Sequence, residues 1–142
     1  MDSKPNAWLP TGKRITMHHS RSELALSRRS GYIPNMSYQS ITATALQARL
    51  GEEDAPLLID VREPIEYEIA RVAGAQLLPM SRFYEWAGTL DTQREIVVMC
   101  HHGIRSAQVC YALAQSGYTK LFNLTGGIAA WSAEVDHNVP QY

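Results

Sequence analysis

Cys100 lies where an apolar run ends and a helix is expected to begin. The run Ile96–Met99 reads as a buried strand, and the helical pattern starts at Arg105. In open parallel α/β sheets, strand ends and helix amino-termini meet at one edge of the sheet, and ligands bind there. Loop amides and the helix dipole make this edge electropositive, which favours a thiolate over a thiol. The sequence therefore predicts a cysteine that ionises readily and holds an anionic sulfur adduct.

The residues after Cys100 leave several interpretations open. Gly103 fits a loop that folds its amides inward, and equally an ordinary turn. Arg105 either steers anionic donors to the loop or pairs with an acid at the surface. The adjacent histidines are expected to project into solvent while their amides face the sulfur, and a metal site is disfavoured because consecutive ligands point in different directions. The candidate loop after the cysteine comprises His101, His102, Gly103, Ile104, Arg105 and Ser106.

Two charged residues and a second cysteine accompany this loop. Asp60 and Arg62 end another apolar run, at the same expected edge of the sheet. They either support the loop through hydrogen bonds or form a structural ion pair with a neighbouring helix. Cys110 has the helical spacing of core residues, so packing is favoured over a role as a resolving thiol. We expect neither a metal nor a cofactor.

Apolar runs alternate with helical stretches from residue 38 onward, which is typical of a parallel sheet wrapped by helices. The final segment, residues 135–142, is polar with one proline and is expected at the surface. The expected strands are 38–41, 56–62, 75–78, 96–99 and 121–124, and the expected helices follow at 42–50, from 63, at 81–87, 105–116 and 126–134.

Charge divides the 142-residue chain into two parts. Residues 1–37 carry a net charge of +4 and residues 38–142 a net charge of −5, which predicts a basic, flexible extension before one acidic domain. The overall charge of −1 gives no reason to expect nucleic acid as a partner, and no stretch has the apolar length of a membrane span. Two cysteines make no disulfide framework, so a reducing compartment, the cytoplasm, is expected. Because the amino-terminus is rich in arginine and serine, organellar import is the alternative.

Several motifs in this order resemble the rhodanese-like domain family, over roughly residues 38–134. One departure is Ala70-Arg71-Val72, where the family usually has Gly-His-Ile. The matching segments are Leu58-Ile59-Asp60-Val61-Arg62-Glu63, Ala73-Gly74-Ala75, Cys100-His101-His102-Gly103-Ile104-Arg105-Ser106 and Gly126-Gly127-Ile128-Ala129-Ala130-Trp131.

The resemblance implies a three-layer α/β/α fold around a five-stranded parallel sheet. It also implies a sulfurtransferase that moves sulfane sulfur from thiosulfate or a similar donor through a Cys100 persulfide. The acceptor would be a thiol, cyanide or a sulfur-carrier protein. The final residues, through Pro140-Gln141-Tyr142, look like those of rhodanese domains fused to adenylyltransferases, so an adenylyltransferase is a further candidate partner.

Two other functions are compatible with the same fold. Rhodanese folds also serve as non-catalytic docking modules, but these typically lack the cysteine, so the intact Cys100 loop favours catalysis. Phosphatases of this fold place five residues between cysteine and arginine, whereas four separate Cys100 from Arg105. The smaller loop suits a sulfur atom better than a phosphoryl group.

Overall fold

Short apolar runs form the strands of a single parallel sheet. The computed structural model describes residues 38–142. Neighbouring strands pair in parallel, in the order β1-β5-β4-β2-β3. The predicted five-stranded parallel sheet is confirmed, whereas the basic extension predicted for residues 1–37 lies outside the described residues. The strands are β1 (Gln39–Ile41), β2 (Leu57–Asp60), β3 (Gln76–Leu77), β4 (Ile96–Met99) and β5 (Leu121–Leu124).

Local sequence signals set the ends of several helices. The Thr42 side chain accepts a hydrogen bond from the amide of Ala45 at 3.2 Å and so caps the helix that follows β1. Pro64 opens the next helix, where its missing N–H costs nothing. The helices are α2 (Ala43–Leu50), α3 (Pro64–Ile69), the 3₁₀ turn η1 (Met80–Arg82), α4 (Phe83–Trp86), α5 (Ile104–Gln115) and α6 (Gly127–Glu134).

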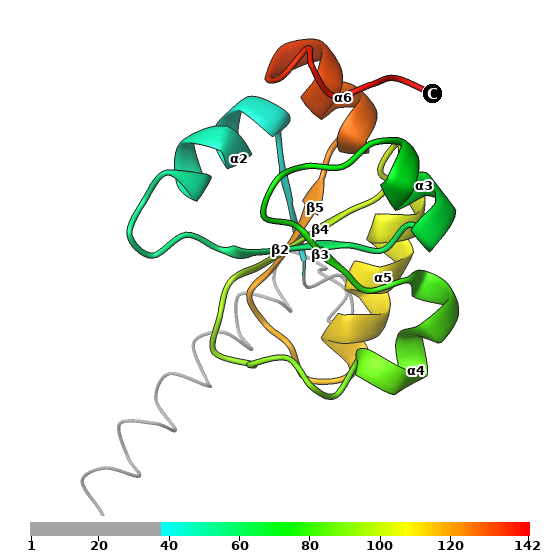
Figure 1. The fold of residues 1–142 in the computed structure, drawn as a ribbon. Helices are drawn as coiled ribbons and strands as arrows, with labels where there is room; N and C mark the ends of the chain where they lie inside the picture. The colour runs from blue at the N-terminus through cyan, green and yellow to red at the C-terminus, as the bar shows by residue number, and fades with distance from the viewer. Residues whose placement is uncertain (1–37) are drawn as a thin grey trace, which may run out of the picture. The chain divides into compact units, whose positions relative to one another are not determined.

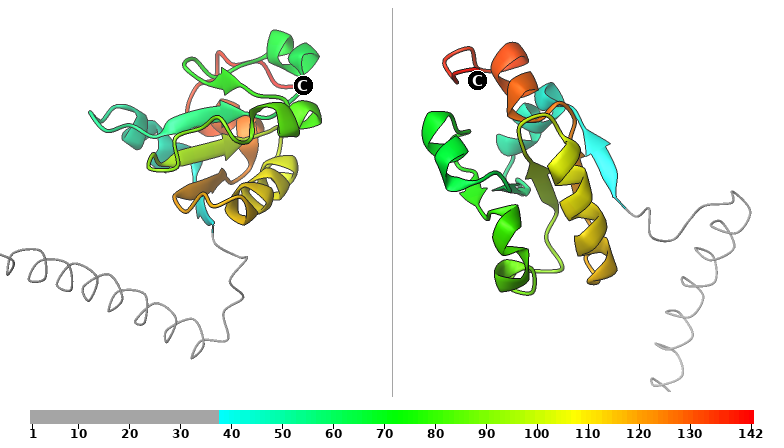
Figure 2. Two further views of the ribbon diagram at one scale, coloured as in Figure 1. Left: turned by 90° about the horizontal axis from the view of Figure 1, so that it is seen from below. Right: turned by 90° about the vertical axis from the view of Figure 1, so that its right-hand side faces the viewer.

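The helices cover both faces of the sheet, as the views in Figures 1 and 2 show. On one face, α2 and α6 pack through Leu46, Ile128 and Trp131 against alternate strand residues. On the other face, α4 and α5 pack through Trp86, Val109 and Leu113. Because side chains alternate along each strand, every central strand contributes to both clusters. The result is the predicted three-layer α/β/α arrangement.

Strand β4 lies in the middle of the sheet, between β5 and β2, and all four of its residues are buried. Its carboxyl end leads directly into Cys100. The flanking strands β2 and β5 end at the same edge, so their following residues surround the cysteine loop.

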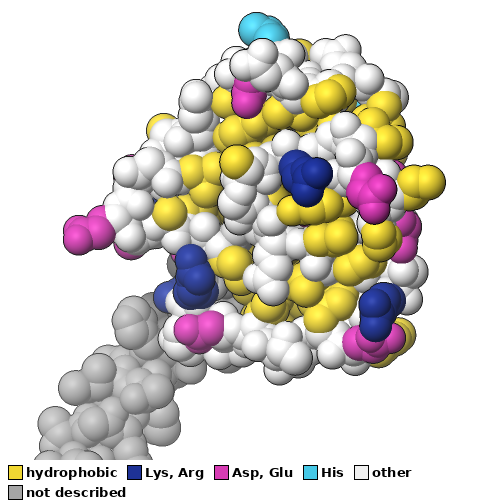
Figure 3. Space-filling view, viewed as in Figure 1, with side chains coloured by type: hydrophobic (Ala, Val, Ile, Leu, Met, Phe, Trp, Pro, Cys, Tyr) yellow, Lys and Arg dark blue, Asp and Glu magenta, His cyan; other side chains and the backbone are white. Residues whose placement is uncertain are grey.

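On the face drawn in Figure 3, the Lys and Arg side chains are scattered singly, and some of them lie beside an acidic side chain. This face therefore presents no basic patch of the kind that binds nucleic acid. Among the described residues, no helix is long and apolar enough to cross a membrane.

Several element bounds differ from the sequence-based expectations, and two of the differences bear on the site. Helix α5 begins at Ile104 rather than at Arg105, because Gly103 adopts a left-handed conformation (φ 104°) that ends the loop one residue earlier. The final segment was expected to lie on the surface throughout, but Val139 is only 8% exposed. The Ser132 hydroxyl donates a hydrogen bond to the Val139 carbonyl at 2.6 Å, and this contact holds the segment against α6.

Candidate active site

The Cys100 sulfur is surrounded by hydrogen-bond donors. The backbone amides of Gly103 and Ser106 lie 3.1 Å and 3.3 Å from Sγ, and the Ser106 hydroxyl lies 3.3 Å from it. The cysteine itself is only 1% exposed. With water largely excluded, these donors act on the sulfur at reduced dielectric screening, where each bond to a charged atom is strengthened. The arrangement is one that stabilises a negatively charged sulfur.

Helix α6 determines which way the loop's peptide groups point. The amides of Ile128 and Ala129, in its first turn, donate hydrogen bonds to the carbonyls of Cys100 and His101 at 2.9 Å and 3.1 Å. These carbonyls accordingly face α6, while amides further along the loop face the sulfur. The amino-terminus of α6 thus satisfies its own unpaired donors and orients the loop with the same two bonds.

The approach of α6 to the loop requires glycine at position 127. A Cβ atom built on Gly127 would lie 2.4 Å from the carbonyl oxygens of both Cys100 and His101, and the residue has φ +58°. Such contact with backbone atoms leaves no room for a side chain. The Gly126-Gly127 pair was visible in the sequence as a turn, but its contact with the cysteine loop was not.

Ser106 and Asn123 connect the loop to β5. Asn123 accepts a hydrogen bond from the Ser106 hydroxyl at 2.5 Å and donates one to the Gly103 carbonyl at 3.1 Å. Ser106 is fully buried. When Cys100 is a thiol, it can donate to the Ser106 oxygen, and when it is a thiolate, the Ser106 hydrogen can turn toward the sulfur. Asn123 was missed in the sequence analysis because nothing in its own segment marks it.

The pKa of Cys100 reflects a competition between burial and hydrogen bonding. Burial alone would raise the pKa of this thiol. The Ser106 hydroxyl, followed by the amides of Ser106, Gly103 and His102, outweighs burial, so the pKa of Cys100 lies below its ordinary value. The environment therefore increases the thiolate fraction near neutral pH, as expected for a nucleophilic cysteine.

Arg105 pairs with an acid in the structure. Its guanidinium binds the Glu66 carboxylate of α3 through two contacts, at 2.8 Å and 2.9 Å. Of the two roles left open for Arg105, the structure displays the ion pair. Glu66 was not singled out from the sequence, because 39 residues separate it from Arg105.

Asp60 and Arg62 form a fully buried ion pair, with an N–O distance of 2.6 Å. Arg62 also donates to the carbonyls of Glu66 and Ala70, at 3.2 Å and 2.6 Å. The pair thereby anchors the carboxyl end of α3. Both residues lie beside the site and support the helix that carries Glu66. Among the described residues, their side chains make no hydrogen bond to the cysteine loop.

The histidine rings differ in their surroundings, which corrects one expectation. His102 is exposed, as expected, but His101 is half-buried between two rings. Its ring centroid lies 3.9 Å from that of His102 and 4.0 Å from that of Tyr142. Burial and then the neighbouring charge of His102 lower the pKa of His101. The final segment reaches this point because Val139 is anchored to α6.

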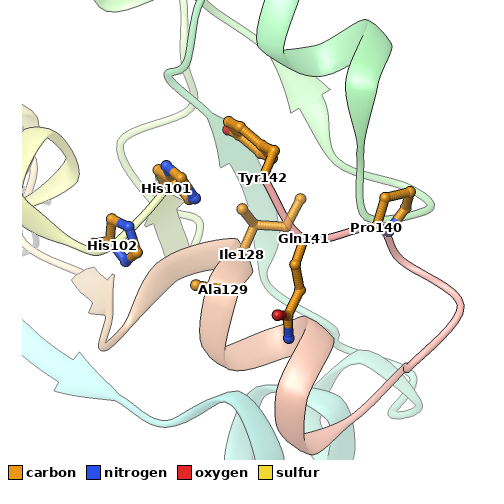
Figure 4. Close-up of a pocket in the computed structure, with 7 residues that line it drawn as sticks. All are labelled: His101, His102, Ile128, Ala129, Pro140, Gln141 and Tyr142. Atoms are coloured by element: carbon orange, nitrogen blue, oxygen red, sulfur yellow. The ribbon is translucent and has the colours of Figure 1, made fainter.

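A pocket of about 150 Å³ opens beside the loop. Figure 4 shows His101, His102 and Tyr142 on one side of it, with Ile128 and Ala129 of α6 and the final segment completing the wall. The two loop residues that follow the cysteine thus line a cavity large enough for a small sulfur compound.

Cys110 lies in the core and not at the site. Cys110 is 0% exposed and belongs to the hydrophobic cluster between the sheet and α5. Burial raises the pKa of Cys110 to about 12. Both cysteines are free thiols. Across residues 38–142, no group of three or more histidine, cysteine, aspartate or glutamate side chains is arranged to hold a metal ion.

Comparison with known proteins identifies the family. The model of the rhodanese-like domain matches residues 42–134, and the chain belongs to this family. A crystal structure of a rhodanese-like domain protein from Staphylococcus aureus superposes with a TM-score of 0.64 at 27% identity, covering 73% of this chain and 98% of that one. The fold expected from the resemblance is therefore confirmed.

Three curated relatives illustrate the range of family members. The sulfurtransferase of Allochromatium vinosum is 35% identical over 100 residues, covering 70% of this chain and 91% of its own. The rhodanese-like/PpiC domain-containing protein 12, chloroplastic, of Arabidopsis thaliana is 41% identical, covering 63% of this chain and 31% of that protein. The probable adenylyltransferase/sulfurtransferase MoeZ of Mycobacterium tuberculosis is 34% identical, covering 72% of this chain and 27% of that protein. The chain thus spans less than a third of the last two relatives.

Proposed function

We propose that this chain is a sulfurtransferase in which Cys100 carries sulfur as a persulfide. The observation that supports this proposal most directly is the set of donors on the Cys100 sulfur, two amides and one hydroxyl within 3.3 Å. A thiolate held there is a nucleophile, and a persulfide anion would be stabilised by donors of the same kind. Relatives named sulfurtransferases, 34–35% identical, support the same assignment.

The reaction would proceed in two steps. The Cys100 thiolate attacks the outer sulfur of thiosulfate, a new S–S bond forms, and the bond to the sulfonate sulfur breaks. Sulfite leaves with the electron pair, so no proton is required from a general acid. An acceptor then attacks the outer sulfur of the Cys100 persulfide, and the thiolate is restored. With cyanide as the acceptor, the product is thiocyanate.

Treatment with thiosulfate followed by intact-mass measurement tests this proposal. We expect one added sulfur atom per chain, which cyanide removes, and no addition in a Cys100→Ser variant. A matched Cys110→Ser variant should still gain the sulfur. A folded protein that takes up no sulfur from thiosulfate or from a small-molecule persulfide would instead support a non-catalytic docking module.

Three further assignments are proposals of the same kind. Residues 38–142 would form the transfer domain, and residues 1–37 a separate basic extension. The acceptor in the cell would be a thiol or a sulfur-carrier protein. An adenylyltransferase is a candidate partner, since the mycobacterial relative is named both adenylyltransferase and sulfurtransferase. The cytoplasm would be the compartment, with organellar import as the alternative, since one relative is named chloroplastic. Trapping the mixed disulfide of Cys100 in a cell extract and identifying the trapped protein would test the choice of acceptor.

A further inference from the structure

The positive charge carried by the cysteine loop is cancelled by a carboxylate on another helix. Arg105, in the first turn of α5, directs two guanidinium nitrogens at the two oxygens of Glu66, at 2.8 Å and 2.9 Å. Its side chain remains 34% exposed, so it lies close enough to solvent to meet an incoming ligand. Arg105 directly precedes Ser106, whose backbone amide lies 3.3 Å from the Cys100 sulfur, so Arg105 belongs to the loop that holds the sulfur.

Glu66 is held in this position by two other contacts besides Arg105. The Tyr142 hydroxyl donates to its Oε1 at 3.0 Å, and the backbone amide of Glu63 donates to its Oε2 at 3.1 Å. Tyr142 is itself fixed, because its oxygen accepts a hydrogen bond from Arg62 at 2.7 Å and its ring stacks on His101. The carboxylate is therefore presented to Arg105 by α3 and by the final segment together. Its hydrogen bonds with Arg105 lower the pKa of Glu66 to about 2, so it is ionised throughout the working pH range.

The pairing of Arg105 with Glu66 affects how strongly the site attracts negatively charged donors. Thiosulfate carries two negative charges, and it must approach a sulfur that is itself negative. A free guanidinium beside the loop would attract it, but a guanidinium bound to a carboxylate presents no net charge at a distance. The other guanidinium near the site, that of Arg62, is likewise paired, with Asp60.

We propose that Glu66 is a specificity-determining residue that, by neutralising Arg105, reduces the preference of the site for dianionic sulfur donors over donors of lower charge. Tyr142 assists as a positioning residue, since it fixes the carboxylate. The inference rests on the sulfurtransferase function proposed above, because it concerns the donor used by that same cysteine.

Two donors that differ in charge but react in the same way provide the test. Thiosulfate is a dianion that releases sulfite, and methanethiosulfonate is a monoanion that releases methanesulfinate. In each case the Cys100 thiolate takes the outer sulfur, and the leaving group keeps the electron pair of the broken S–S bond. Initial rates are measured for each donor with cyanide as the acceptor, at low and at high ionic strength, and kcat and KM are determined separately.

Glu66→Gln should lower the KM for both donors, but to different degrees. By Coulomb's law, a unit positive charge about 8 Å from an anion in water changes the affinity about sixfold for a dianion and about 2.5-fold for a monoanion at low ionic strength. The first factor is the square of the second, because the interaction scales with the donor's charge. The change should be in KM rather than kcat, and it should diminish as salt is added. Any effect of the freed charge on the thiolate is common to both donors and cancels in their ratio.

Glu68→Gln is the matched control, since it removes the same charge from the same helix and Glu68 is exposed. It should leave the ratio of the two KM values unchanged. Arg105→Gln should shift that ratio in the opposite direction, because it leaves the Glu66 carboxylate without its cation. The double variant Glu66→Gln/Arg105→Gln should return the ratio toward that of the parent protein. Thermal unfolding of every variant reports whether it is folded.

The outcomes separate this inference from the proposed function. Sulfur transfer by the parent protein, with a donor ratio that is the same in the parent protein and in folded Glu66→Gln, would overturn the role of Glu66 alone. An equal change in Glu68→Gln would also overturn it, because a general effect of charge would then explain the result. Absence of transfer from both donors in the parent protein would instead contradict the sulfurtransferase assignment itself.

Discussion

Replacing Ser106 by alanine tests the physical origin of the thiolate. The Ser106 hydroxyl is the strongest of the groups that lower the pKa of Cys100. A hydrogen bond to a charged group contributes about 1.5–3 kcal/mol. We expect the lower end of this range, because the hydroxyl lies 3.3 Å from the sulfur and is shared with Asn123. About 1.4 kcal/mol corresponds to one pKa unit, so the pKa of Cys100 should rise by about one unit in Ser106→Ala.

The reactivity of the variant should change in opposite directions at low and high pH. Below the pKa, a tenfold loss of thiolate is partly offset by greater intrinsic nucleophilicity, so the rate should fall about threefold to fourfold. Above the pKa, where ionisation is complete, the same effect should raise the rate about threefold. The assay is the rate of reaction with dithiodipyridine, a neutral disulfide, followed by the absorbance of the released thiopyridone across the pH range.

A buried serine away from the sulfur provides the control for this experiment. Ser132 is 2% exposed, and its hydroxyl donates to the Val139 carbonyl. Ser132→Ala should lose stability, as Ser106→Ala does, without moving the inflection of the pH profile. An unchanged inflection in folded Ser106→Ala, or an equal shift in Ser132→Ala, would refute the reasoning.

Three other predictions follow from the packing and the charges around the site. Gly127→Ala should destabilise the protein by several kcal/mol, because the new Cβ would lie 2.4 Å from two backbone carbonyl oxygens of the loop. The control is Gly117→Ala, where φ is +101° but nothing lies within 4 Å of the new Cβ. This variant should lose only about 1–2 kcal/mol of stability, measured for both variants by urea unfolding. Cys110→Ala should retain sulfur transfer, and the number of thiols that react with dithiodipyridine should be the same as in the parent protein, since burial raises the pKa of Cys110 to about 12. Loss of the persulfide in this variant would contradict the packing role of Cys110. Glu66 should stabilise the folded state above about pH 5, because its pKa is lowered from 4.5 to about 2 and the unfolded state therefore binds more protons between these values. The stability difference between the parent protein and Glu66→Gln should accordingly shrink as the pH falls from 5 toward 2, and a difference independent of pH would argue against the ion pair.

The sequence predicted the features that arise from local patterns. Alternating apolar runs and helical stretches indicated the parallel sheet, and the position of Cys100 after a buried strand indicated the edge on which the site would lie. These predictions succeed because strand burial and helix amphipathicity are encoded within a few neighbouring residues. The same pattern indicated five strands, and the resemblance to rhodanese-like domains agreed with that number.

The contacts that shape the site come from residues far apart in the chain. Tyr142 meets Glu66 across 76 residues, and Asn123 meets Gly103 across 20. No periodicity connects such residues, so the tyrosine was assigned to an exposed tail and the asparagine was passed over. Gly127 was recognised as a turn glycine, but its requirement depends on the distance between α6 and the loop, which only the assembled fold determines.

The most direct test of the account compares the ionisation of Cys100 in the folded and the unfolded protein. In a Cys110→Ala background, Cys100 is the remaining thiol, and its thiolate can be followed by ultraviolet absorbance during a pH titration, with and without denaturant. The loop amides and the Ser106 hydroxyl should give the folded protein the lower pKa. A folded-state pKa equal to or above that of the unfolded chain would contradict the account, because burial would then outweigh the hydrogen bonds on which the proposed nucleophile depends.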